Sequence, residues 1–281
     1  TWEARSGSSP AFSESRMPIA DLRGVRLHYQ LEGADGAPAL ALAHSLGTDL
    51  SLWNPVVARL SSACQILRWD MRGHGESSVI PGPSKLLDFG RDFLALLDTL
   101  EIHHCHFAGI SLGGMLGLWL AIHAPERLGK LILANTAARI GQPRHWEERI
   151  ALVRHQGLAS VAAGSAERWF TSAWRQAHAE DVTRITQRLA SSSSEGYISA
   201  CAALRDADLT ADLYRVQAQT LVVAGAFDPV TTPEDGRTLE RSIPRAHYIE
   251  LAAAHLAPVE CPAEFSQAVL AFLAPQEEPR G

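Results

Sequence analysis

Short apolar runs rich in β-branched and aromatic residues recur along the chain, and segments with helical periodicity separate most of them. Many runs end at Gly, Asp, Asn or Ser, which is typical of strands that stop at a turn. We predict strands at Val25–Leu31, Ala39–Ala43, Cys64–Trp69, His104–Ala108, Lys130–Ala134, Thr220–Ala224 and His247–Leu251. Because strands that alternate with helices pair in parallel, the pattern predicts an α/β fold: a mostly parallel central sheet flanked by helices.

Three of the intervening segments have apolar residues at the spacing of one helix face. They are Leu86–Leu100, Leu112–His123 and Phe265–Leu273. The alternation of strands and helices then stops over residues 136–213, where helical periodicity continues without a convincing strand. We predict that this segment is a helical cap inserted into a core of residues 17–135 and 214–275, over the carboxyl edge of the sheet.

The two ends of the chain are expected to lie outside this fold. Residues 1–16 are polar and rich in serine, without the apolar stretch of a secretory signal. We interpret them as a disordered extension, a tag remnant or an alternative start ahead of Met17. Residues 276–281 are expected to form a short tail.

Composition narrows the classes of function. The chain has 25 basic and 31 acidic residues, a net charge of −6, and 46% hydrophobic residues, so neither disorder nor a nucleic-acid footprint is expected. The most apolar stretch, residues 107–122, is too short to span a membrane. Four dispersed cysteines without a C-x-x-C pair favour reduced thiols, and we predict a cytoplasmic protein. The oligomeric state is not predicted.

A candidate nucleophile lies in the string Gly109-Ile110-Ser111-Leu112-Gly113, which matches G-x-S-x-G. The string alone occurs by chance, but here it follows a predicted strand and begins an apolar helix, the context that the motif requires. The glycines leave room for a strained turn that exposes the Ser111 hydroxyl. We therefore predict that Ser111 is a nucleophile.

A serine needs a base and an orienting acid, and in this fold class they follow it in the order Ser, Asp, His. Asp228 comes just after the predicted strand Thr220–Ala224, and His255 follows the last strand. We assign these two residues to the triad. His74 precedes the serine and is interpreted as a structural residue.

No metal site is predicted from the histidines. His103, His104 and His106 are close in sequence, but consecutive side chains of a strand point to opposite faces and cannot converge on one ion. We expect neither a metal nor an organic cofactor.

Two backbone amides are candidates for an oxyanion hole. The Leu112 amide lies at the start of the helix after Ser111, and a second donor is expected from the loop after an early strand. The string His44-Ser45-Leu46-Gly47 occupies that place, and we assign Leu46 as the donor.

The chain resembles the α/β-hydrolases, and among them the 3-oxoadipate enol-lactonases of aromatic catabolism. The resemblance covers residues 17–273 and rests on the strings SLGTDL (45–50), WDMRGHG (69–75), GISLGGM (109–115), ANTAARIG (134–141), ERWFT (167–171) and, after Asp228-Pro229, TPEDG (232–236). It implies the same triad, Ser111, Asp228 and His255. His44 departs from the pattern, which has a small or amide residue there.

The resemblance implies an anionic substrate, a five-membered enol-lactone with a carboxymethyl group. A buried carboxylate needs a cation or a hydrogen-bond donor. We predict Trp146 and Arg139 for this role, with Arg144 and Arg149 as other available cations. Two alternatives stay open: a broader carboxylesterase, lactonase or perhydrolase with the same triad, and a non-catalytic ligand-binding protein.

Overall fold

The computed structural model describes residues 18–22 and 24–274, and within them eight strands form one sheet in the order β1-β2-β4-β3-β5-β6-β7-β8. The strands are β1 (Ile19–Asp21), β2 (Arg26–Glu32), β3 (Ala39–Ala43), β4 (Gln65–Trp69), β5 (Cys105–Ile110), β6 (Leu128–Ala134), β7 (Thr220–Gly225) and β8 (Ala246–Leu251). From β4 to β8 all neighbours are parallel, whereas β1–β2 and β2–β4 are antiparallel. The predicted α/β sheet is confirmed.

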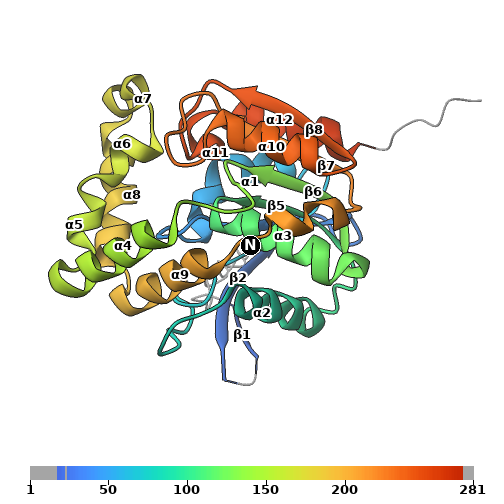
Figure 1. The fold of residues 1–281 in the computed structure, drawn as a ribbon. Helices are drawn as coiled ribbons and strands as arrows, with labels where there is room; N and C mark the ends of the chain where they lie inside the picture. Colours follow the sequence, from blue (N-terminus) through green and yellow to red (C-terminus); the bar gives the residue numbers. More distant parts are fainter. Residues whose placement is uncertain (1–17, 23, 275–281) are drawn as a thin grey trace, which may run out of the picture.

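Helices cover both sides of the sheet (Figure 1). The core helices are α1 (Asn54–Leu60), α2 (Leu86–Thr99), α3 (Leu112–His123), α10 (Pro233–Ser242), α11 (Ala257–Glu260) and α12 (Pro262–Leu273). The central strands β3 to β7 are buried almost throughout, because helices shield both of their faces. Short 3₁₀ helices η1 (Leu50–Trp53), η2 (Pro125–Arg127) and η3 (Thr210–Arg215) complete the connections.

Between β6 and β7 the chain forms a run of helices that lies to one side of the sheet, in yellow-green to orange (Figure 1). They are α4 (Pro143–Gln156), α5 (Ala159–Ala162), α6 (Ser165–Trp169), α7 (Ser172–Ala177), α8 (Ala179–Ser191) and α9 (Ser194–Asp206). We call residues 136–213 the cap. The predictions for residues 1–16 and 276–281 fall outside the described residues.

Candidate active site

Ser111 occupies a strained turn between β5 and α3. Its backbone angles are φ 56° and ψ −116°, in a region that residues with a side chain rarely adopt. The turn is possible because its glycines lack side chains: a Cβ on Gly109 would lie 2.1 Å from the Gly113 carbonyl oxygen, and one on Gly113 would lie 2.3 Å from that of Ala43. The Ser111 N–H donates to the carbonyl oxygens of Ala134 and Asn135, both at 3.1 Å, which fixes the turn against β6.

Two amides near Ser111 are available to a ligand. Within the part of the chain that the structure describes, the N–H groups of Leu46 and Leu112 donate to no protein acceptor. Leu46 lines the same cavity as Ser111, and the Leu112 amide begins α3. Unpaired donors at a helix start and in an adjacent loop can stabilise an oxyanion.

Asp228 and His255 form a buried pair. Asp228 follows β7 and His255 follows β8, so the parallel strands bring both residues to the carboxyl edge of the sheet. The His255 Nδ1 donates to the Asp228 Oδ2 at 2.8 Å, which leaves Nε2 as the basic nitrogen. His255 and Ser111 line one cavity. This arrangement can activate a serine hydroxyl for attack on a carbonyl carbon.

The Asp228 carboxylate is held ionised by further donors. Its Oδ2 accepts from Asn135 Nδ2 at 3.0 Å and from the Thr231 hydroxyl at 2.7 Å, and its Oδ1 accepts from the Val230 amide at 2.8 Å. Burial acts to raise the pKa of Asp228, but the imidazole of His255 and these hydrogen bonds outweigh it, so the pKa lies below its usual value.

Sequence reasoning did not assign Asn135 and Thr231 to the site. A signal for Asn135 exists, because it directly follows β6 at the same edge of the sheet as the two catalytic candidates. Its φ of 41° also marks an unusual turn. Thr231 lies three residues after Asp228, but only the folded loop shows that its hydroxyl turns back to the carboxylate.

The cavity that contains Ser111 has a volume of about 380 Å³, within the range of small-molecule sites. Core and cap residues line it together: Ser45, Leu46, Ser111, Ile140, Gly141, Gln142, His145, Trp146, Arg149, Ser165, Arg168, Trp169, Tyr197, Leu204, Pro229, Val230 and His255. Trp169 is buried and contributes to the cavity wall.

The cap side of the cavity carries excess positive charge. Arg149 of α4 and Arg168 of α6 both line it, and neither has a carboxylate partner within 4.0 Å among the described residues. Burial and the charge of Arg149 lower the pKa of Arg168. Burial, and then the two arginines, also lower the pKa of His145 despite the nearby Glu148. A buried anion would relieve this repulsion.

The two predicted substrate ligands differ in position. Trp146 lines the cavity, but its indole N–H donates to the Ile140 carbonyl oxygen at 2.6 Å, so it offers an apolar wall rather than a donor. Arg139 does not line the cavity, contrary to the prediction, and pairs with Asp208 at 3.1 Å. The reason is a backbone bond between Leu209 N–H and the Ala138 carbonyl oxygen, which sets Arg139 beside Asp208.

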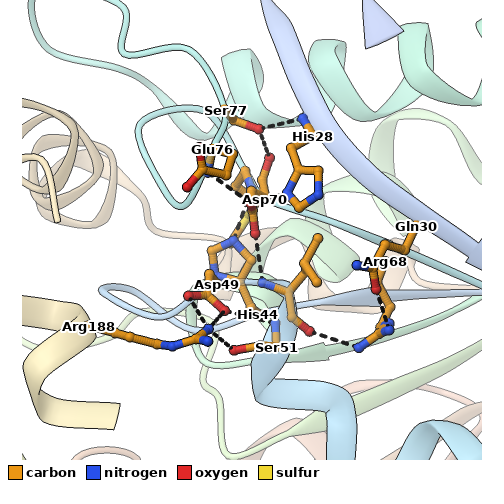
Figure 2. A network of polar contacts seen from close by, with 12 residues as sticks. His28, Gln30, His44, Asp49, Ser51, Arg68, Asp70, Glu76, Ser77 and Arg188 are labelled. Atoms are coloured by element: carbon orange, nitrogen blue, oxygen red, sulfur yellow. Dashed lines mark hydrogen bonds and ion pairs between the residues drawn. The ribbon is translucent and has the colours of Figure 1, made fainter. Parts of the chain in front are cut away.

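A polar network supports the loop that carries Leu46 (Figure 2). His44 is fully buried, its Nδ1 donates to the Ser45 carbonyl oxygen at 2.8 Å, and its Nε2 accepts from the Met71 amide at 2.9 Å. Both nitrogens are therefore used by the neutral ring, and burial lowers the pKa of His44. Histidine thus fits this position, where the resemblance led us to expect a smaller residue.

Asp70 lies at the centre of the network in Figure 2. Its Oδ1 accepts from the Leu50 amide at 2.8 Å, and its Oδ2 pairs with His28 Nδ1 at 2.7 Å. Farther along the same loop, Asp49 pairs with Arg188 of the cap at 3.0 Å. The network therefore fixes the loop from the core side and connects it to helix α8.

Comparison with known proteins agrees with this geometry. Residues 38–262 match a family model described as the alpha/beta hydrolase fold. The chain is 44% identical over 249 residues to 3-oxoadipate enol-lactonase 2 of Acinetobacter baylyi, which covers 89% of this chain and 93% of that protein. The chain belongs to the α/β-hydrolase family, among the 3-oxoadipate enol-lactonases.

Two solved structures are similar to this chain along nearly their whole length. The enol-lactonase from Burkholderia xenovorans superposes with a TM-score of 0.90 and 38% identity, covering 91% of this chain and 99% of the other. A hydrolase from Pseudomonas aeruginosa gives a TM-score of 0.90 and 42% identity, covering 94% and 100%.

Two structural features are absent from the described residues of this α/β hydrolase. No group of three or more His, Cys, Asp or Glu side chains is placed to hold a metal ion. None of the described helices has the length and apolar character needed to cross a membrane.

Proposed function

We propose that this protein is a serine hydrolase that opens the ring of 3-oxoadipate enol-lactone to give 3-oxoadipate. One observation supports the proposal most directly. Ser111 and His255, which is hydrogen-bonded to Asp228, line the same cavity as two arginines that have no carboxylate partner among the described residues. The names of the relatives support the same substrate.

In the proposed reaction the Ser111 Oγ attacks the lactone carbonyl carbon while His255 Nε2 takes the hydroxyl proton. The Leu46 and Leu112 amides stabilise the oxyanion that forms. Asp228 keeps the imidazole in the required tautomer through its 2.8 Å bond to Nδ1. His255 then gives its proton to the departing enol oxygen, so the ring opens and an acyl-enzyme remains.

Water completes the cycle. His255 takes a proton from a water molecule that attacks the acyl carbon, and the proton returns to Ser111 as the ester bond breaks. The released enol then tautomerises to the ketone. Apart from the water molecule, each step of this reaction uses side chains and backbone amides of the chain itself.

Arg149 and Arg168 are the proposed anchor for the carboxymethyl group. Their charges face the cavity from the cap, while Ser111 lies on the core side. Tyr197 lies within 3.3 Å of Arg149, and burial raises its pKa to about 12, so its hydroxyl stays neutral and leaves the positive charge uncompensated. The substrate carboxylate would supply the missing countercharge.

The test is the loss of enol-lactone absorbance, with the lactone generated from muconolactone by its isomerase. Wild type is compared with Ser111→Ala and His255→Ala, and with cleavage of p-nitrophenyl acetate. Fast lactone loss that depends on both residues, beside feeble ester cleavage, is the expected result. Ester cleavage without lactone turnover would instead indicate a general carboxylesterase.

A further inference from the structure

Glu260 connects the cap to the loop that carries His255. It ends α11, the single helical turn after His255, and its side chain folds back toward that loop. The Glu260 Oε2 accepts from the Ala254 amide at 2.9 Å, and the Oε1 accepts from the Thr171 amide at 3.2 Å and from the Thr171 hydroxyl. One carboxylate therefore has donors from two parts of the chain that are far apart in sequence.

Each donor lies next to a part of the site. Ala254 directly precedes His255, and its carbonyl oxygen is held by Asn135 at 3.1 Å. Thr171 comes just after α6, the helix that carries Arg168 and Trp169. A further bond joins the same two segments, because the Leu256 amide donates to the Trp169 carbonyl oxygen at 3.0 Å. The residues on both sides of His255 are thus connected to the cap: Ala254 through Glu260, and Leu256 by its own hydrogen bond.

We propose that Glu260 is a positioning residue that sets the catalytic base and the substrate-anchoring face of the cap in one fixed relation. The inference rests on the serine-hydrolase chemistry of the proposed function. Glu260 itself is absent from the cavity lining, so it acts through Ala254 and Thr171 rather than on the substrate. Its role depends on the hydrogen bonds between its side-chain head group and these two residues.

The amide variant separates this role from a simple effect of charge. In Glu260→Gln the side-chain oxygen at the position of Oε2 still accepts from the Ala254 amide at 2.9 Å and from the Thr171 amide at 3.4 Å. The new NH₂ group at the position of Oε1 donates to the Thr171 hydroxyl, which can reverse its direction. In Glu260→Ala both donors lose their acceptor. The matched control is Glu264→Ala, because Glu264 is an exposed glutamate four residues later that makes no side-chain hydrogen bond within the described residues.

The experiment measures kcat and KM for the enol-lactone and for p-nitrophenyl acetate, with thermal unfolding as a check on folding. Because small misplacements of a catalytic group are costly, Glu260→Ala is expected to lower kcat/KM for the lactone by about 10–100-fold. Its kcat for the neutral ester also falls. Glu260→Gln restores most of the loss, and Glu264→Ala matches wild type.

Thr171→Val provides a second test that leaves Glu260 in place. It removes the hydroxyl that donates to Glu260 and that also accepts from the Trp174 amide at 3.3 Å at the start of α7. Because both contacts hold the cap, we expect KM for the lactone to rise more than kcat falls. Wild-type kinetics in a folded Glu260→Ala variant, or an equal loss in Glu260→Gln and Glu260→Ala, would overturn the proposal. Wild-type lactone kinetics in Thr171→Val would overturn it if Glu260→Ala does not fold.

A separate measurement tests the positioning role of Glu260 even if the proposed function is wrong. If wild type does not open the lactone, the rate at which a fluorophosphonate labels Ser111 still reports the position of His255. Slower labelling of Glu260→Ala than of Glu260→Gln would support the positioning role. Equal labelling rates would contradict it.

Discussion

Replacing Arg168 with methionine tests how the cavity distinguishes anionic from neutral substrates. Methionine keeps much of the length of the side chain and removes the charge. Arg168 lines the cavity near Arg149, without a carboxylate partner in the described part of the chain, so the substrate carboxylate would be its countercharge. A hydrogen bond to a charged group contributes about 1.5–3 kcal/mol. Its loss corresponds to a fall of about 10–150-fold in kcat/KM.

The assay compares two lactones with the same ring. One is the carboxymethyl enol-lactone, and the other is the neutral lactone in which a methyl group replaces the carboxymethyl group. Arg168→Met is expected to lose activity on the first and to keep it on the second, because only the first brings a carboxylate to the cap. The loss is expected mainly in KM if the contact is as strong in the ground state as in the transition state.

Arg139→Met is the matched control for this experiment. Arg139 pairs with Asp208 outside the cavity, so its substitution is expected to leave both rates close to wild type. Equal losses on the two lactones in Arg168→Met would refute the anchoring role. So would a selective loss in Arg139→Met together with normal kinetics in Arg168→Met, because that result would restore the prediction made from the sequence.

Three other substitutions have defined outcomes. Asp228→Asn should lower kcat by about 10⁴-fold with a native fold, measured by lactone turnover and circular dichroism, because the amide favours the wrong tautomer of His255. Gly113→Ala places a Cβ 2.3 Å from the Ala43 carbonyl oxygen, and overpacking of this kind lowers the free energy of unfolding by about 1–3 kcal/mol. Denaturant unfolding would measure this loss, and the lactone assay would show a loss of activity. Burial lowers the pKa of His74 from 6.5 to about 3, so stability is lost as the pH falls below about 6.5. At pH 5 this shift lowers the free energy of unfolding by about 2 kcal/mol, and His74→Gln should flatten the dependence of that free energy on pH in this range. An unchanged slope would contradict the low pKa of His74.

The periodic elements of the core could be predicted from the sequence because local patterns determine them. Strand Ala39–Ala43 and helix Leu112–His123 have the predicted bounds. Strand β1, by contrast, has only three residues, too few for a readable period. The antiparallel direction of β2 depends on its pairing with β4, a contact between distant segments that no local pattern contains.

The residues of the candidate site likewise fall into those that the sequence could predict and those that it could not. Ser111, Asp228 and His255 could be predicted because each follows a strand, and parallel strands deliver their carboxyl ends to one edge. Of the two cavity cations, Arg149 was one of several arginines that the sequence offered, and Arg168 was not identified. The two arginines belong to different cap helices, and no periodic pattern predicts how those helices pack. The same holds for Glu260, whose partners lie on two other segments.

The most direct test of the account is the ratio of kcat/KM for the carboxymethyl and methyl enol-lactones, measured with the wild-type protein and Ser111→Ala. We expect Ser111-dependent turnover that favours the carboxymethyl lactone by about 10-fold or more, as for one charged hydrogen bond. Equal rates on the two lactones, or turnover that survives in Ser111→Ala, would contradict it.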